Sequence, residues 1–502
     1  MNRNRCFGVL LHPTALPGPH GIGSIGAPAR EFVSVLNHMG ASLWQMLPLQ
    51  PPDSGNSPYS ADSVFAWNPL LIALDELEER GLLNRGEMPP GEVAGDSVDY
   101  DRVRGIKNRC FERAFGRFEA YGDIDSDPYR SFIERNSYWI EDYALFKVIQ
   151  RSAGPAWQHW PSEYKTRETN ALDEVRKSRG RELHLVYFQQ FEFHRQWQIL
   201  RESARNAGVR LIGDLPIFAA LNAADVWSHP EYFQLDGELR PVSVAGVPPD
   251  YFSDTGQLWG NPLYDWDRLK ADGYEWWIQR MASALAAVDI VRIDHFRGFE
   301  KYWAVPAGEA TAMNGEWRTG PGHALFQAIR DRLGRLPVIA EDLGVITPEV
   351  ETLRDAFELP GMKILQFAFG GGSDNPYLPH HHISRCVVYT GTHDNNTTVG
   401  WWDAMDDTTR EVVRRQMEAI QGHPVTDPVD DLLRMCIGSV ADWAVAPVQD
   451  LLNLGAEARM NTPGTALGNW QWRLIDWVAL NSACDGIRRR LDLFNRLSFP
   501  SY

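Results

Sequence analysis

Eight short apolar runs, each followed by polar residues, recur along the chain. They span residues 7–13, 42–49, 209–216, 290–296, 336–343, 362–369, 386–394 and 443–452. Amphipathic helical patterns lie between most of them, among them residues 27–40, 188–208 and 275–288. Short buried runs that alternate with helices are typical of parallel strands joined by crossover helices. Eight such runs predict an α/β fold, the (β/α)8 TIM barrel, in which functional groups lie at the carboxyl ends of the strands.

Two segments are too long to be simple barrel loops. Residues 51–181 carry helical patterns of their own, at 103–122 and 137–150, and predict an inserted, largely helical subdomain after the second strand. Residues 218–269 are rich in Pro, Gly and aromatic side chains and predict an aromatic loop subdomain after the third strand. Loops of this length are usually functional or disordered, and so many aromatics argue against disorder. We expect both insertions at the C-terminal face of a single catalytic domain that covers residues 1–502.

The composition is that of a globular protein, with 44% hydrophobic and 23% charged residues among 502. The formal net charge of -17 disfavours nucleic acid as a partner, because an acidic surface repels the phosphate backbone. The apolar runs are too short to span a membrane or to form a signal segment, so no membrane partner is expected. The five scattered cysteines form no CxxC pair and predict reduced thiols of a cytoplasmic protein. We expect a monomer or a small homo-oligomer.

Charged side chains follow the predicted strands. They are Asp214, Arg292, Asp294, Glu341, Asp342, His393 and Asp394. Side chains two apart on a strand share a face, so Arg292 and Asp294 are expected to point the same way. Carboxyl groups that converge on one rim push each other's pKa values apart, which yields one ionised and one protonated group. Retaining glycosidases use such a pair, about 5–5.5 Å apart, as nucleophile and acid/base.

Other interpretations of the same residues stay open at this point. A strand-end aspartate often caps a helix, and Arg292 with Asp294 could be a structural ion pair. Asp, Glu and His side chains at a barrel mouth can also bind divalent metals. Against a metal site, the first strand supplies His12 alone and no HxH pair, so none is predicted. The chain carries no P-loop, no GxSxG and no convincing GxGxxG, and no cofactor is expected.

Longer motifs resemble a known family. Asp294 in VRIDHFRGF, Glu341 in IAEDLG and Asp394 in GTHDNNT together resemble the catalytic signature of the α-amylase clan. Over the whole chain the sequence is more similar to the 4-α-glucanotransferases, also called amylomaltases or disproportionating enzymes, of glycoside hydrolase family 77. The specific matches are residues 57–72, 213–227, 246–266, 292–306 and 458–473. This family lacks the C-terminal β-domain of α-amylases, and none is expected here.

The resemblance implies transfer of an α-1,4-glucan segment to the 4-hydroxyl of glucose or another glucan, by a retaining double displacement through a covalent glucosyl-enzyme. It implies that Asp294 is the nucleophile, Glu341 the acid/base, and Asp394 the group that holds sugar hydroxyls and favours the distorted ring. α-1,4-Glucans and maltooligosaccharides are the implied partners. Substrate binding is implied for Tyr59, Asp214, Arg292 and His393 on the donor side, and for Ser57, Gln257, Trp259, His295 and Asn469 on the acceptor side or in the loops over it.

Two rival functions use the same features. An α-1,4-glucan hydrolase of the same clan would use the same three carboxylates, and a non-catalytic glucan-binding barrel would keep the aromatics but is expected to lose a carboxylate. Transfer requires that water be excluded and an acceptor held, and the aromatic segment 246–266 could do both. Asp342 competes with Glu341 but faces the other way, so a structural role is expected. Trp67 departs from the family, which often has a small residue there, and so puts acceptor-side contacts in question.

Overall fold

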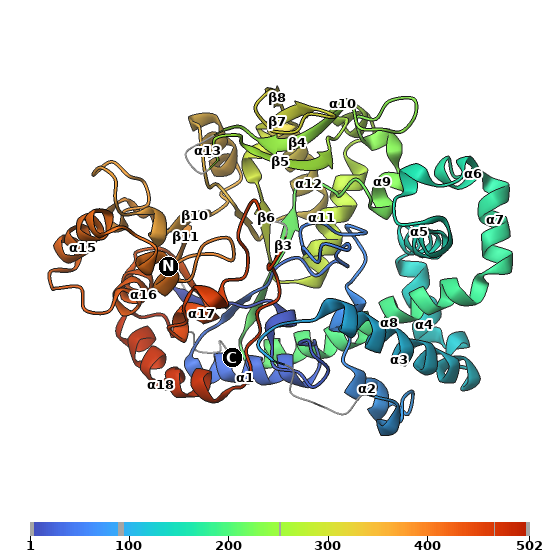
Figure 1. Cartoon of the computed structure of the whole chain (residues 1–502), viewed down its shortest axis with the longest axis horizontal. Helices are drawn as coiled ribbons and strands as arrows, with labels where there is room; N and C mark the ends of the chain where they lie inside the picture. The colour runs from blue at the N-terminus through green and yellow to red at the C-terminus, as the bar shows by residue number, and fades with distance from the viewer. Residues whose placement is uncertain (1–4, 89–94, 250–252, 466, 498–502) are drawn as a thin grey trace.

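The centre of the computed structural model is an eight-stranded parallel sheet in the order β10-β11-β12-β1-β2-β3-β6-β9 (Figure 1). The structure describes residues 5–88, 95–249, 253–465 and 467–497. The strands are β1 Cys6–Leu10, β2 Leu43–Gln45, β3 Arg210–Pro216, β6 Ile290–Asp294, β9 Val338–Ala340, β10 Gly361–Ile364, β11 Cys386–Tyr389 and β12 Trp443–Pro447. Each forms from one of the eight predicted apolar runs. The amide of Ala340 donates to the carbonyl of Pro360 at 2.9 Å, so β9 meets β10 and the sheet nearly closes into the predicted barrel.

The strands read as apolar runs because both of their faces are covered. All five residues of β1 are buried, between the barrel interior and the surrounding helices. Gly8 in β1 is required by close approach, because a Cβ there would lie 2.7 Å from the Cβ of Leu43 on β2. Neighbouring strands can therefore lie at normal ladder distance only with glycine at this position.

Helices surround the sheet. The larger ones are α1 Ala27–Met39, α8 Gly180–Asn206, α11 Glu275–Ala287, α12 Gly322–Leu333, α13 Pro348–Ala356, α15 Asp407–Gln421, α16 Pro428–Gly438 and α18 Val478–Leu493, with the short α14 Thr398–Asp403 and α17 Val448–Leu451. Helix α1 begins with Pro28 in its first turn and ends at Gly40, whose φ of 85° stops the helix. Helix α8 begins at Gly180, earlier than the predicted residue 188. No helix among the described residues is long and apolar enough to cross a membrane.

In the described residues between β2 and β3, six α-helices precede α8 and form the right-hand part of the view in Figure 1. They are α2 Leu74–Glu79, α3 Tyr100–Ala120, α4 Asp127–Arg135, α5 Ile140–Ala153, α6 Ser162–Lys165 and α7 Thr169–Ser178. The helical patterns at 103–122 and 137–150 correspond to α3 and α5. Aromatic contacts join this group to α8, for example Phe118 with Phe188 at a centroid distance of 5.0 Å. The insertion is thus fixed to the barrel through a shared aromatic core.

A second, antiparallel sheet lies where a long aromatic loop was expected. Its order is β5-β4-β7-β8, with β4 Ser243–Val247, β5 Gln257–Pro262, β7 Lys301–Pro306 and β8 Glu316–Thr319. The loop interpretation of 218–269 was therefore incomplete: this segment supplies two strands and the helices α9 Ala224–Ser228 and α10 Trp266–Ala271, and the sheet continues beyond residue 269. Residues 250–252 of the predicted segment lie outside the described residues. Figure 1 shows this sheet at the top of the view, above β6.

Candidate active site

Arg292 lies between two carboxylates at the ends of β3 and β6. Its Nη1 is 2.8 and 2.7 Å from the two carboxylate oxygens of Asp214 and 3.0 Å from Oδ1 of Asp294. The β3–β6 register places Asp214 directly beside Arg292, and the two side chains are 0% and 3% exposed. A guanidinium is always charged, so it compensates the burial of both carboxylates. The predicted common direction of Arg292 and Asp294 is confirmed.

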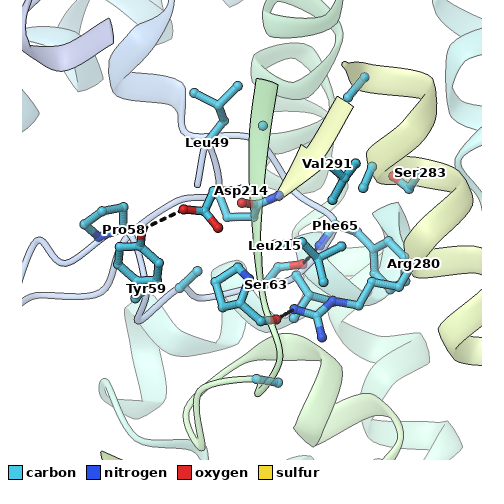
Figure 2. Close-up of a pocket in the computed structure, with 18 of the residues that line it drawn as sticks. Leu49, Pro58, Tyr59, Ser63, Phe65, Asp214, Leu215, Arg280, Ser283 and Val291 are labelled. Carbon is cyan, nitrogen blue, oxygen red and sulfur yellow. Dashed lines mark hydrogen bonds between the residues drawn. The ribbon is translucent and has the colours of Figure 1, made fainter. Parts of the chain in front are cut away.

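Tyr59 connects the end of β3 to the end of β11. Its hydroxyl donates to Oδ2 of Asp214 at 2.7 Å and lies 2.8 Å from Nε2 of His393. The Tyr59 and His393 rings also stack, with a centroid distance of 5.2 Å and an interplanar angle of 14°. Figure 2 shows the Tyr59–Asp214 bond at one end of a cavity of about 60 Å³ whose other walls are mostly apolar. Burial, together with the charge of Asp214, raises the pKa of Tyr59 well above its usual value. Tyr59 is therefore a permanent hydrogen-bond donor.

Glu341 follows β9 and is held by two backbone amides. Its Oε2 accepts from the amide of His295 at 2.7 Å and its Oε1 from the amide of Leu343 at 3.0 Å. His295 has a φ of 53°, a left-handed conformation that a residue with a Cβ adopts only when its surroundings impose it. Burial, reinforced by the negative charge of Asp294, raises the pKa of Glu341 to about 8. At neutral pH this carboxyl is mostly protonated and can donate a proton.

Asp294 is the last residue of β6, and its side chain is 28% exposed. Burial raises its pKa to about 6, against the opposing effect of the Arg292 charge. Asp294 and Glu341 interact, so the two groups titrate as a pair. Asp294 loses its proton first because Arg292 lies against it. The site therefore holds one ionised and one protonated carboxyl near neutral pH.

Asp394 lies beyond β11, with contacts to His393 and to a distant loop. Its Oδ2 is 3.3 Å from Nε2 of His393, and its Oδ1 accepts from Nδ2 of Asn461 at 2.6 Å. Burial acts to raise the pKa of Asp394, but the charge and hydrogen bond of His393 and the bond from Asn461 outweigh it and bring the pKa below its ordinary range. Asp394 is thus ionised at any ordinary pH.

The predicted acceptor-side residues lie in three places. Trp259 on β5 is 38% exposed, and its ring lies edge-on to His295 at 4.8 Å. Its Nε1 donates to Oε1 of Gln257 at 3.2 Å, so Gln257, Trp259 and His295 form one cluster beside Glu341. Ser57 lies in the Tyr59 loop, where its Oγ accepts from the Tyr59 amide at 3.3 Å.

Asn469 lies elsewhere, in the loop that carries Asn461. Its Oδ1 accepts from the amide of Thr462 at 2.8 Å and its Nδ2 donates to the carbonyl of Thr465 at 2.9 Å. Sequence reasoning missed three residues of this loop region that reach the site: Asn461, Arg459, whose Nη2 donates to the Asp394 carbonyl at 2.7 Å, and Trp470, whose ring is 6.0 Å from His393. The matched motif at 458–473 contains all three and was the available signal.

Two further residues have structural contacts. Asp342 accepts from the amide of Met362 at 2.7 Å and pairs with Nη1 of Arg354 at 2.5 Å, which ties β9 to β10 and α13. This is the structural role expected of it. Trp67 stacks on Phe193 of α8 at 4.9 Å and 14°, and lines the cavity of Figure 2.

Within the described part of the chain, no group of three or more His, Cys, Asp or Glu side chains is placed to hold a metal ion. The side chains that the structure brings together here are the carboxyl groups of Asp214, Asp294, Glu341 and Asp394, the guanidinium of Arg292, and the hydroxyl and imidazole groups of Tyr59 and His393. Such a set can bind a polyhydroxylated ligand and perform acid/base and nucleophilic steps at it.

Comparisons with known proteins agree with this geometry. The family model described as 4-alpha-glucanotransferase matches residues 11–477. A 4-alpha-glucanotransferase of Thermus thermophilus is 48% identical over 95% of this chain and 96% of its own length. The chloroplastic/amyloplastic 4-alpha-glucanotransferase DPE1 of Arabidopsis thaliana is 44% identical over 98% of this chain and 86% of its own. Among solved structures, the amylomaltase from Streptococcus agalactiae in complex with acarbose has a TM-score of 0.92 at 34% identity, covering 98% of this chain and 99% of that one.

Proposed function

Since the chain belongs to the 4-alpha-glucanotransferase family, its activity is the transfer of α-1,4-glucan segments, and we propose that it proceeds by a retaining double displacement at Asp294 and Glu341. The observation that carries the proposal is the division of labour between these two carboxyls. Arg292 lies 3.0 Å from Asp294 and favours its ionised form, whereas Glu341 has a raised pKa and keeps its proton near neutral pH.

In the first step, a carboxylate oxygen of Asp294 attacks the anomeric carbon of the donor glucan. The glycosidic C1–O4 bond breaks, and Glu341 gives its proton to the departing O4. In the second step, the 4-hydroxyl of an acceptor attacks the same carbon, Glu341 takes the hydroxyl proton, and the ester to Asp294 breaks. Two inversions leave the new bond in the α configuration. Arg292 would stabilise the carboxylate of Asp294 before and after each turnover.

Asp394 would bind the sugar on the donor side. Its ionised carboxylate is oriented by Asn461 and His393, and it can accept hydrogen bonds from two neighbouring sugar hydroxyls. Such bonds favour the distorted ring of the oxocarbenium-like transition state. Tyr59, Asp214 and His393 would form the wall beside it.

Transfer, rather than hydrolysis, requires that an acceptor sugar outcompete water. The half-exposed ring of Trp259, edge-on to His295 beside Glu341, offers a stacking surface where an acceptor sugar would lie. The antiparallel sheet that carries Trp259 would also shield the covalent intermediate from water. An α-1,4-glucan hydrolase is the alternative function, with the same carboxylates and no productive acceptor site.

Incubation with maltotriose alone tests the activity. We expect glucose and longer maltooligosaccharides to form while the number of reducing ends stays constant, because each broken bond is replaced by a new one. A rise in reducing ends with only glucose and maltose as products would identify a hydrolase. If the maltotriose stayed unchanged, the result would indicate a glucan-binding protein without catalytic activity.

We further propose α-1,4-glucans and maltooligosaccharides as the partners and the cytoplasm as the location. The five cysteines are all buried and none of them forms a disulfide, which suits a reducing compartment. The net charge of -17 disfavours binding to nucleic acid and to anionic membrane surfaces. A monomer or small homo-oligomer is the proposed state.

A further inference from the structure

A second cavity, of about 260 Å³, lies between the inserted helices and the barrel. Its walls come from four places: the loop with Ser63 and Phe65, the start of α5 with the residues just before it, the segment of α9 and the turn after it, and the first turns of α11. Ser63 and Phe65, which line it, also line the cavity that contains Tyr59 and Asp214 in Figure 2. The second cavity is therefore a neighbour of the donor side of the site, but it contains none of the three proposed catalytic carboxylates.

Aromatic rings form the floor and part of the rim. Phe65 and Trp276 are buried, with their centroids 6.1 Å apart. Above them Tyr138 is 39% exposed and meets Phe65 edge-on at 5.4 Å, and the half-buried Tyr232 lies 6.4 Å from Trp276. Two accessible tyrosine rings, held by a buried aromatic pair, are a preformed stacking surface for a flat apolar face.

The polar part of the lining carries carboxylate, amide, hydroxyl and imidazole groups, the last from His229. The Asp142 side chain is 27% exposed and pairs with Arg167 at 2.5 Å. The Glu275 side chain is 44% exposed and lies 3.7 Å from Arg332. Each arginine contact leaves part of the carboxylate free to accept further hydrogen bonds. Their remaining lone pairs can accept hydrogen bonds from hydroxyl groups. Gln279 adds an amide beside Glu275.

This combination disfavours two ligand classes and favours a third. Carboxylates at the rim repel phosphates and other anions, and an aliphatic ligand would leave those carboxylates without hydroxyl donors. A glucose ring has an apolar face of C–H bonds for the tyrosines and hydroxyl donors around its edge for the carboxylates. We propose that this cavity is an additional glucan-binding site, which holds one part of a long α-1,4-glucan while another part occupies the catalytic centre.

The identity of the ligand rests on the proposed function, and the site adds a dependence on chain length. A long glucan can occupy both sites, so the second contact acts at high effective concentration and raises the apparent affinity. Maltotriose is too short to gain from it. The enzyme is therefore expected to favour long donors, because only they can reach the second cavity, which Tyr138 and Tyr232 line.

The test compares Tyr138→Ala and Tyr232→Ala with the control Tyr121→Ala, a 61% exposed tyrosine at the end of α3. Each variant is assayed for kcat/KM on maltotriose and on long amylose. Loss of one stacked ring should lower kcat/KM on long amylose by about tenfold and leave kcat/KM on maltotriose within about twofold of the unmodified enzyme. Tyr138→Phe keeps the ring and should retain most of the activity on long amylose. Tyr121→Ala should behave as the unmodified enzyme on both donors.

Two outcomes would overturn the inference. Equal loss on maltotriose and amylose, with a lower melting temperature, would show that Tyr138 and Tyr232 serve the fold. Unchanged kinetics on both donors would show that no glucan binds there. If the unmodified protein transfers maltotriose, either outcome in the variants refutes this site alone, whereas an unmodified protein without transfer on maltotriose refutes the proposed function itself.

Discussion

The dependence of activity on pH follows directly from the environments of Asp294 and Glu341. In the proposed mechanism, the productive enzyme has Asp294 ionised and Glu341 protonated. With a pKa of about 8, Glu341 is about nine-tenths protonated at pH 7, whereas its ordinary value of 4.5 would leave less than about one per cent. Activity is lost as the pH falls through about 6, because Asp294 gains a proton, and as it rises through about 8, because Glu341 loses one.

The assay is kcat/KM for a maltooligosaccharide donor between pH 4.5 and 10. We expect a bell-shaped profile that falls about tenfold for each unit below the acid limb and above the alkaline limb. The two apparent pKa values belong to the coupled pair and should lie near 6 and 8.

A change of leaving group separates the two limbs. Fluoride departs without a proton, so α-maltosyl fluoride as donor should remove the alkaline limb and keep the acid limb. Glu341→Gln should lower kcat/KM on maltooligosaccharides by roughly 10²–10⁴ and lower it far less on the fluoride. An alkaline limb that persists unchanged with α-maltosyl fluoride would refute the role of Glu341 as the acid.

Four further predictions follow from the same structure. Trp259→Ala should weaken acceptor capture by about ten- to a hundredfold while water attack falls less, so the ratio of hydrolysis to transfer rises; an unchanged ratio with a lower melting temperature would refute the stacking role. Asp342→Asn should cost about 1–3 kcal/mol in the free energy of unfolding, measured in urea, because it removes the buried carboxylate partner of Arg354 and leaves that arginine with the more exposed Asp355, whereas the exposed control Asp407→Asn should cost less than about 1 kcal/mol. Dialysis against EDTA should leave activity unchanged, and loss that Ca²⁺ or Zn²⁺ restores would revive a metal site. Asp294→Ala should lower kcat by several orders of magnitude with a normal melting temperature; near-normal turnover would contradict its role.

The barrel could be predicted because its signal is local. Strands buried on both faces must be apolar at nearly every position, so the eight barrel strands appear as apolar runs in the sequence. The polar residues that end these runs mark one rim of the barrel. The second sheet gives no such signal. Residues 257–262 of β5 are mostly half-buried or exposed and include Gly260 and Pro262, and β4 pairs with β7 across the whole of α10, α11 and β6. Pairing at that separation depends on tertiary contacts that residue periodicity does not encode.

The residues of the candidate site also divide into those that local spacing predicts and those that only the tertiary structure places. Arg292 and Asp294 share a face because strand side chains alternate, and this was visible from their spacing. The bond from Asn461 to Asp394 joins residues 67 positions apart through a loop, and no pattern in the sequence distinguishes Asn461 from Asn469 in the same motif. The left-handed His295, which aims its amide at Glu341, is likewise set by tertiary structure rather than by local propensity.

The central claim is that Asp294 forms a covalent bond to the donor sugar, and trapping that bond tests it most directly. Glu341→Gln incubated with α-maltosyl fluoride should form the glycosyl-enzyme at a useful rate, because fluoride needs no acid, and break it slowly, because no base activates the acceptor. Mass spectrometry of the intact protein and of its peptides should show one added maltosyl unit on the peptide that contains Asp294. An adduct on another carboxylate, such as Asp394, or complete consumption of the fluoride with inverted configuration and no adduct, would contradict the mechanism.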